Sequence, residues 1–342
     1  MVLKDKRIAV LSPVAWRTPP REYGAWETVA SNITEGLVAR GWDVTLFATK
    51  DSITKAKLHA VIEKGYEEDR RQIPWVVGCL HISEVMERAD DFDLIHNNFD
   101  YLPLTYSRLI RTPMLTTIHG FSSPYILPVY HKYRDNYYVS ISDSDRDKDL
   151  PYLATVYNGI DLSNLTFRSE PGDKLTFLGR IHDDKGVHLA IETAKKCGKD
   201  LIIAGIIQDQ DYFDNLVKPH INDSTIQFIG SVNPVQRDAL FKETYAVLHL
   251  NTIPERFGLV MAESMAAGVP VIAMDLGSCR EVIADNETGY LVNNVNEAAE
   301  AVGKIDKIDR RKCRQRVEEN FTIDKMVSGY EKVYEEIFRR EA

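Results

Sequence analysis

The chain has 342 residues, about twice the length of a typical single domain, so two domains of roughly 170 residues each are expected. With 44% apolar and 27% charged residues, the composition is that of a globular protein and excludes collagen, coiled-coil and low-complexity classes. A net charge of −9 argues against affinity of the whole chain for nucleic acid or anionic lipid.

Cysteine usage and hydropathy indicate a cytoplasmic protein. The cysteines form no C-x-x-C pair, so free thiols in a reducing compartment are expected for Cys79, Cys197, Cys279 and Cys313. The apolar run after Lys4, Lys6 and Arg7 is too short for a signal peptide and predicts a first strand. No run of 18 apolar residues occurs, so any membrane contact is expected to be peripheral.

The first half of the chain alternates short β-branched runs with helical periods, which is typical of βαβ units around a parallel sheet. A strand over 7–12 is followed by a helix in which Val29, Ile33 and Leu37 recur every four residues. Later strands are predicted over 43–49, 93–96, 114–119, 137–142 and 154–157.

The second half repeats this alternation after a segment rich in Asn, Asp, Ser, Gly and Pro over 158–173, which we interpret as a domain linker. Strands are predicted over 174–179, 200–205, 226–230, 245–251 and 269–274. A last helix carries one apolar stripe, formed by Met326, Tyr330, Val333, Tyr334 and Ile337. The predicted fold class is α/β, with two Rossmann-like, doubly wound parallel-sheet domains that face a ligand-binding cleft.

One candidate site is the segment FLGRIHDDKG at 177–186. Arg180 and Lys185 lie between the end of a predicted strand and a helix that Gly186 opens. An Arg fork, a Lys charge and helix-start N–H groups together favour a bound phosphate. Solvated side chains in a surface loop are the alternative interpretation.

A second candidate is the segment 251–273, in which Glu255 and Glu263 are eight residues apart. The backbone N–H groups near Phe257, Gly258 and Leu259 lie between them. Two carboxylates beside exposed amides suit a polyhydroxylated ligand, because each hydroxyl both donates and accepts. Alternatively, Glu255 is only a first-turn partner of the helix dipole.

The N-terminal half offers weaker candidates. Gly24 lies between the first strand and its helix, and His119 ends a predicted strand. Asp100 lies in the strand-end loop NNFDY and is a candidate contact for an acceptor. Each of these residue types is also common in a purely structural role. The motifs G-x-G-x-x-G and G-x-x-x-x-G-K-[ST] are absent.

Taken in order, these segments resemble a known family. The order HG at 119–120, ISDSDR at 141–146, YNGID at 157–161, LGR with Lys185, and the Glu255/Glu263 pair is similar to the retaining glycosyltransferases of family 4, which have the GT-B fold. The most specific part is ERFGLVMAESMAAGVPVIA, followed by GSCREVIADNETGYLV at 277–292.

The resemblance implies a role for each candidate. Arg180 and Lys185 would bind the diphosphate and Gly24 would contact it through its backbone, while Glu263 would hold the ribose. Glu255 and the amides near Phe257, Gly258 and Leu259 would bind the donor sugar, beside which His119 would lie. The chain departs from the family at Tyr23-Gly24, where paired glycines are usual, and at Arg256, where Pro is common.

The function implied is retaining transfer of a hexose from a nucleoside diphosphate sugar, with UDP-glucose preferred, to a hydroxyl of a small molecule, a saccharide or a lipid-linked sugar. Neither a metal nor another cofactor is expected. A GDP-mannose-dependent mannosyltransferase, a nucleotide-sugar epimerase and a nucleotide-sugar-binding protein without catalysis are alternatives. The resemblance also implies an acceptor-side domain over 1–157, joined by the helix 323–342, and a nucleotide-sugar domain over 158–322.

Overall fold

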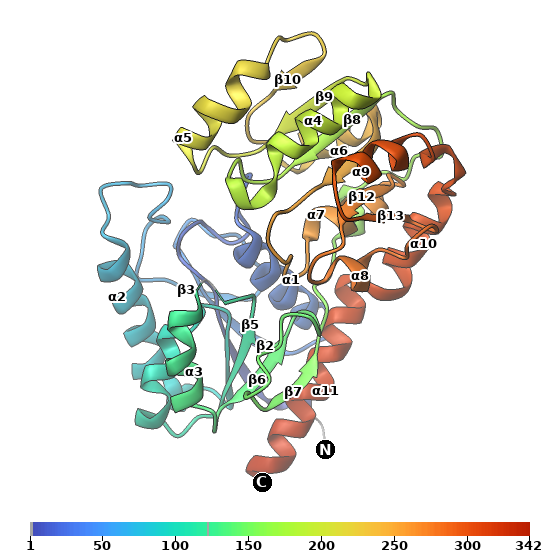
Figure 1. Ribbon diagram of the computed structural model, residues 1–342. Coiled ribbons are helices and arrows are strands. Elements are labelled where there is room, and N and C mark those ends of the chain that lie inside the picture. The colour runs from blue at the N-terminus through green and yellow to red at the C-terminus, as the bar shows by residue number, and fades with distance from the viewer. Residues whose placement is uncertain (1–2, 122) are drawn as a thin grey trace. The chain divides into compact units, whose positions relative to one another are not determined.

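The computed structural model describes residues 3–121 and 123–342, and the chain divides into two compact units (Figure 1). One unit comprises Met1–Gly159 with Ile323–Ala342, and the other comprises Ile160–Thr322. The boundary between the units lies after Gly159, whereas a boundary after residue 157 was expected from the sequence. Within the described residues, no helix combines the length and the apolar composition needed to cross a bilayer.

The first unit is built on a parallel sheet with the strand order β3-β2-β1-β4-β5-β6-β7 in its described part. The strands are short and mostly buried, as expected for a sheet covered on both faces. Their bounds are β1 (Arg7–Leu11), β2 (Asp43–Phe47), β3 (Lys57–His59), β4 (Leu94–Asn97), β5 (Met114–Ile118), β6 (Tyr137–Ser140) and β7 (Tyr152–Thr155). The strands predicted from the β-branched runs are confirmed, whereas β3 was not predicted.

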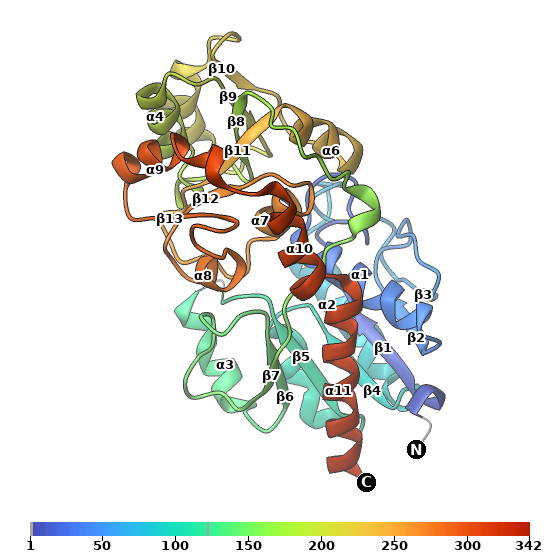
Figure 2. The same ribbon diagram turned by 90° about the vertical axis from the view of Figure 1, so that its right-hand side faces the viewer.

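The helices of the first unit are α1 (Ala25–Ala39), α2 (Pro74–Glu87), α3 (Leu127–Lys132) and α11 (Ile323–Glu341). The predicted stripe on α11 is confirmed, because all five of its residues are buried. Figure 2 shows α11 lying beside α1 within this unit, and the two helices are in contact. The last helix is therefore part of the core of the first unit.

Buried hydroxyls also tie α11 to the sheet. His96 on β4 is bonded through Nδ1 to the hydroxyl of Tyr334 at 2.7 Å and through Nε2 to Oγ1 of Thr117 at 2.8 Å. The hydroxyl of Tyr330 reaches the same Thr117 Oγ1 at 2.9 Å. Buried polar groups are costly unless they are paired, so these bonds fix the register of α11 on β4 and β5.

The second unit repeats the architecture around a parallel sheet with the order β10-β9-β8-β11-β12-β13 in the residues described. Its strands are β8 (Lys174–Leu178), β9 (Leu201–Ala204), β10 (Ile226–Phe228), β11 (Thr244–His249), β12 (Val271–Met274) and β13 (Gly289–Val292). Its helices are α4 (Val187–Cys197), α5 (Gln210–Tyr212), α6 (Pro234–Glu243), α7 (Leu259–Ala266), α8 (Cys279–Val282), α9 (Val295–Val302) and α10 (Arg310–Asn320).

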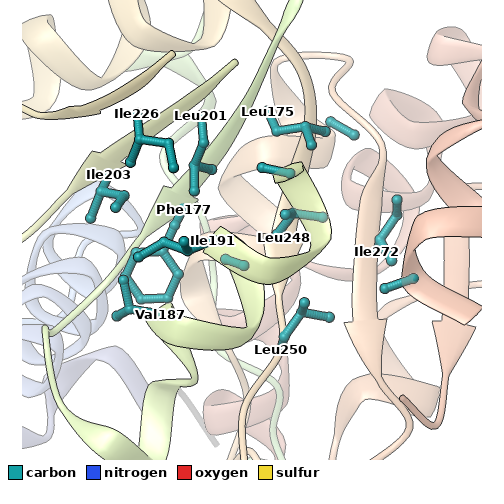
Figure 3. Close-up of a cluster of buried hydrophobic side chains, with 14 of the residues drawn as sticks. Leu175, Phe177, Val187, Ile191, Leu201, Ile203, Ile226, Leu248, Leu250 and Ile272 are labelled. Atoms are coloured by element: carbon teal, nitrogen blue, oxygen red, sulfur yellow. The ribbon is translucent and has the colours of Figure 1, made fainter. Parts of the chain in front are cut away.

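The core of the second unit lies between α4 and the strands (Figure 3). Val187 and Ile191 of α4 pack against Phe177, Leu201 and Leu248, all of which are nearly or fully buried. Their spacing of four residues places both α4 side chains on one face of the helix. This packing fixes the start of α4 next to the ends of β8 and β11.

Both sheets reverse their strand order beside the first strand of the unit. The reversal lies between β1 and β4 in the first unit and between β8 and β11 in the second. In open parallel sheets, ligands bind at the carboxyl ends of the strands at such a point. The loops after these four strands are therefore where each unit is expected to hold a ligand.

Candidate functional site

The loop after β8 carries Arg180, and its guanidinium is held by two neighbours. Arg180 donates to Oδ2 of Asp184 at 2.8 Å and also to the side-chain oxygen of Gln208. Its side chain is 24% exposed, so a ligand can reach the cation. These contacts orient Arg180 without burying it.

Lys185 extends from the same loop to Glu255, which follows β11. Its Nζ lies 2.7 Å from Oε2 of Glu255, with both side chains largely buried. Gly186 makes this approach possible, because its φ is +65° and a Cβ there would lie 1.9 Å from the carbonyl oxygen of Leu250. Any other residue at 186 would push the start of α4 away from the end of β11.

Glu255 accepts hydrogen bonds through both carboxylate oxygens. Besides Lys185, Oε2 accepts from Nε2 of His249 at 2.9 Å and from Nδ2 of Asn251 at 2.7 Å. Oε1 accepts from the backbone N–H of Arg256 at 2.9 Å. Glu255 therefore orients Lys185, and it does not act only as a partner of the helix dipole.

These partners decide the ionisation of Glu255. Burial alone would raise the pKa of Glu255, but the hydrogen bond from His249 and the charge of Lys185 outweigh it and hold the pKa well below its usual value. The carboxylate is therefore ionised at neutral pH.

The turn after Glu255 leads directly into α7. Gly258 has φ +78° and caps α7, and a Cβ on it would lie 2.3 Å from Cε of Met261. The first N–H groups of a helix, here from Leu259 onward, have no carbonyl partner inside the helix. The ring of Phe257 is buried against Phe321 at 5.6 Å between ring centroids, so Phe257 offers a ligand its backbone and not its side chain.

Glu263 lies inside α7 and pairs with Arg237 of α6. The Nη1 atom of Arg237 is 3.0 Å from Oε1 of Glu263, and the Glu263 side chain is only 8% exposed. Burial raises the pKa of Glu263, and the charge of Arg237 opposes that rise only in part. Glu263 and Glu255 thus differ: Glu263 pairs with the cation of Arg237, whereas Oε2 of Glu255 accepts from Lys185, His249 and Asn251.

The start of α4 differs in one respect from the phosphate-binding helix start that the sequence predicted. The backbone N–H of His188 donates to the hydroxyl of Tyr212 at 3.0 Å. The same hydroxyl lies 2.7 Å from Nδ1 of His188. The tyrosine comes from α5, so a side chain already satisfies this helix-start amide, and the cations carry the anion-binding character of the loop.

Several buried polar atoms around these residues have no hydrogen-bond partner in the described part of the chain. They include Oδ1 of Asn251, Oγ of Ser278 and Nε of Arg237. Asn251 bonds Glu255, and Arg237 pairs with Glu263, while the N–H of Ser278 donates to the carbonyl of Glu255. Buried polar atoms are normally paired with protein, water or a ligand, so these three atoms are available to a polar group that enters the site.

In the first unit, His119 follows β5 and is buried. Its Nε2 donates to Oδ1 of Asn98 at 3.0 Å, and its ring stacks on Trp26 of α1 at 5.4 Å between centroids. Burial lowers the pKa of His119 to about 3, so the imidazole is neutral. A neutral histidine in this position can exchange hydrogen bonds with a sugar but does not carry a positive charge.

Gly24 and Asp100 line one cavity of the first unit, of about 400 Å³. Gly24 caps α1, and Asp100 lies after β4 with φ +68°. Glu27, also in this cavity, accepts the N–H of Trp16 at 3.2 Å, and burial raises its pKa to about 7. Burial likewise raises the pKa of Asp100 to about 6, although the hydroxyl of Tyr130 donates to it at 2.5 Å.

The second unit thus brings together Arg180, Lys185, Glu255 and Glu263 with the start of α7. Gly24, Asp100 and His119 lie at the strand ends of the first unit, and their roles toward the donor or acceptor stay predictions. Three residues that contact the glutamates were not predicted from the sequence, namely His249, Asn251 and Arg237. The local signal for two of them is the position of His249 and Asn251, two polar residues that lie two positions apart at the end of a predicted strand.

Comparison with known proteins matches both halves of the chain to glycosyltransferase families. Residues 26–164 match the family Glycosyltransferase Family 4, and residues 166–321 match Glycosyl transferases group 1. A glycosyltransferase of Methanocaldococcus jannaschii, described as uncharacterized, is 27% identical over 78% of this chain and 82% of its own length. A phosphatidyl-myo-inositol mannosyltransferase of Mycobacterium tuberculosis is 23% identical over 91% of this chain and 89% of its own.

Solved structures show the same fold. The Anabaena protein HepE, in complex with UDP and glucose, matches with a TM-score of 0.76 and 18% identity, over 96% of this chain and 99% of that one. Two family matches that together span most of the chain, and two Rossmann-like parallel sheets, agree with one assignment. The chain belongs to the glycosyltransferases of family 4 and has the GT-B fold.

Proposed function

We propose that the enzyme transfers a hexose from a nucleoside diphosphate sugar to a hydroxyl acceptor, with retention of the anomeric configuration. The observation that carries the proposal is the buried Lys185–Glu255 pair at the strand-order reversal of the second unit, beside the accessible Arg180. Two oriented cations at such a point suit a diphosphate, which needs charge and several donors.

The bond between the anomeric carbon and the diphosphate breaks as the acceptor oxygen bonds to that carbon. Negative charge grows on the departing phosphate oxygen, which takes up the proton of the acceptor hydroxyl. Arg180 and Lys185 stabilise this charge, a role worth a few kcal/mol per donor in comparable sites. Glu255 keeps Lys185 oriented through Oε2, while Oε1 accepts the N–H of Arg256 and can also accept a sugar hydroxyl. In this proposal Glu263 binds the ribose hydroxyls.

We propose that this chemistry needs no divalent metal, because two side-chain cations occupy the place in the mechanism that a metal takes in other transferases. Retention itself rests on the family resemblance. NMR spectroscopy of the product at early times tests it, since an inverted linkage would contradict the mechanism.

UDP-glucose is the proposed donor. HepE, with the same fold, was solved with UDP and glucose, which supports the choice. The mannosyltransferase among the relatives supports the alternative, a mannosyl donor such as GDP-mannose.

Thermal unfolding with UDP, GDP and their sugars tests the donor site. A ligand at 100 times its dissociation constant stabilises the folded chain by about 2.7 kcal/mol, enough for a measurable rise in melting temperature. The base that gives the larger rise identifies the nucleotide. If none of these ligands raises it, the donor site is wrongly assigned.

A further inference from the structure

The helix α2, which lies at one edge of the first unit (Figure 1), exposes a stripe of apolar side chains. Ile73 at the N-cap, Val76 and Leu80 recur at steps of three and four residues, which places them on one face of the helix. Their exposed fractions are 62%, 52% and 53%. Single exposed apolar residues are ordinary on a protein surface, whereas a contiguous apolar patch marks a surface that binds another molecule.

The opposite face of α2 fixes the helix to the first unit. Val77, Ile82 and Val85 are nearly or fully buried on that face. Nε2 of the buried His81 donates to the carbonyl oxygen of Ser12 at 2.9 Å. The exposed stripe takes no part in this packing, so substitutions on it should leave the core of the unit intact.

The two ends of the stripe differ in charge. Before it, Arg70 and Arg71 have side chains that are 75% and 90% exposed. Each pairs with an acidic residue nearby in the chain, but pairs that involve such exposed groups are weak. After the stripe, the segment 84–91 carries four acidic residues and one Arg, and Glu87 in this segment is exposed. The cations at the first end and the acids at the last end make the face complementary to itself when two copies run in opposite directions.

Helix geometry places these charges opposite one another in such a pair. If Val76 of one copy faces Leu80 of the other, the two-fold axis passes midway between these positions. Arg71 lies five positions before Val76, and therefore opposite the turn that lies five positions after Leu80 of the second copy. That turn contains Glu84 and Glu87. Each contact occurs twice, because the two-fold axis repeats it.

The same charges argue against a membrane as the partner of the stripe. Helices that bind anionic lipid surfaces carry Lys and Arg beside their apolar face. Here four acidic residues follow the stripe, and anionic headgroups would repel them. A second copy of the chain offsets their charge instead, because it brings its own Arg70 and Arg71 to them.

We propose that the exposed stripe of α2 binds a second copy of the chain, as an antiparallel helix pair around a two-fold axis. Val76 against Leu80 of the second copy supplies the apolar contact, and Arg71 with Glu87 supplies an ion pair at each end. Such a dimer is independent of the proposed transferase function, so either can fail without the other.

Sedimentation equilibrium of the full chain tests the dimer. The mass should rise with concentration toward twice that of one chain. Leu80→Glu should raise the dissociation constant of the dimer about 30-fold or more, because it places a charge at the centre of the contact. Leu109→Glu is the matched control, since Leu109 is 79% exposed in the same unit, lies outside α2 and should leave the dissociation constant unchanged. Melting curves of both variants check that each is folded.

Charge exchange tests the antiparallel direction. Arg71→Glu and Glu87→Arg should each raise the dissociation constant about fivefold to 30-fold, because each brings like charges together at both ends of the pair. The double variant restores opposite charges and should return the dissociation constant to within about threefold of the original value. Losses that add up in the double variant overturn the antiparallel arrangement.

Cys79 is a probe of the distance between the two copies. It is exposed and lies next to the midpoint between Val76 and Leu80, so the two thiols should lie on the same side of the contact. A short bismaleimide should link two unmodified chains and should fail with Leu80→Glu, which retains the thiol. Cys79→Ser should abolish the link, because the other three cysteines are partly or fully buried.

Two results in solution overturn the proposal. One is a chain that stays monomeric up to about 1 mM, and the other is a dimer that Leu80→Glu leaves as stable as before. Flotation with vesicles of phosphatidylcholine and phosphatidylglycerol tests the membrane alternative, and no flotation is expected. Binding to these vesicles that Leu80→Glu abolishes, without a dimer in solution, would assign the stripe to lipid and overturn the proposal.

Discussion

The two units treat buried charge in opposite ways. In the second unit each buried carboxylate of the site has a cationic partner, as in the Lys185–Glu255 and Arg237–Glu263 pairs. In the first unit the buried Glu27 and the half-buried Asp100 lie among aromatic rings without such a partner in the described lining of their cavity. Pairing holds a buried carboxylate in its charged form, whereas burial without a cationic partner raises the pKa of the carboxyl.

The largest expected effect comes from breaking a pair in the second unit. Lys185→Ala removes a cation from the leaving group and leaves Glu255 without its main charge partner, so turnover should fall by about 10²-fold to 10³-fold. The free energy of unfolding should also fall by about 3 kcal/mol or more. Lys195→Ala, at an exposed lysine near the end of α4, the helix that follows the loop of Lys185, is the control in the kinetic and melting assays.

The two glutamates offer a sharper test, because their surroundings differ. Glu263→Gln should weaken UDP by about 1–3 kcal/mol in calorimetric titration, through loss of a charge-assisted hydrogen bond to the ribose. Glu255→Gln should lower turnover and leave the affinity for UDP nearly unchanged. If both variants stay folded and lose UDP equally, the division of roles between the two glutamates is wrong.

The stability of the first unit should depend on pH in the opposite sense from that of a unit whose buried carboxylates are paired with cations. A carboxyl whose pKa is higher in the folded chain binds its proton more tightly there, so folding is favoured below pH 4.5 and loses this contribution as pH rises through about 7. For Glu27 the loss is about 3 kcal/mol at most, at roughly 1.4 kcal/mol per unit of pKa. Glu27→Gln should reduce the difference in melting temperature between pH 5 and pH 8.

The smallest expected effect concerns metals. Because Arg180 and Lys185 supply the positive charge, turnover should change little in EDTA. Loss of activity in EDTA, restored by Mg²⁺ or Mn²⁺, would show that the cations of the second unit are not sufficient.

The sequence predicted most of the fold because the strands are buried and rich in β-branched residues, which leave a clear pattern. β3 escaped prediction because it has three residues and none is fully buried. β13 begins with Gly289, which is depleted in strands. The helix α2 has apolar residues on both faces, since Trp75 and Leu80 are exposed while Ile82 is buried, so it shows no single stripe.

The sequence also indicated the charged residues of the candidate site, but not their partners. Lys185 and Glu255 are 70 residues apart in the chain, and no local pattern indicates that they touch. Arg237 lies in a helical segment with many polar residues, which is typical of an exposed helix. The packing of α6 brings its side chain to Glu263. Long-range pairing of this kind depends on strand order, which short motifs do not encode.

The helix α11 has a consequence for how the protein is made. Residues 160–322 leave the ribosome as a complete unit, whereas the first unit lacks α11 until residue 341 has been synthesised. Until then His96 and Thr117 lack the hydroxyls of Tyr334 and Tyr330. The unit whose synthesis begins first is therefore the last to complete its core. It cannot do so until the whole of the second unit has been synthesised.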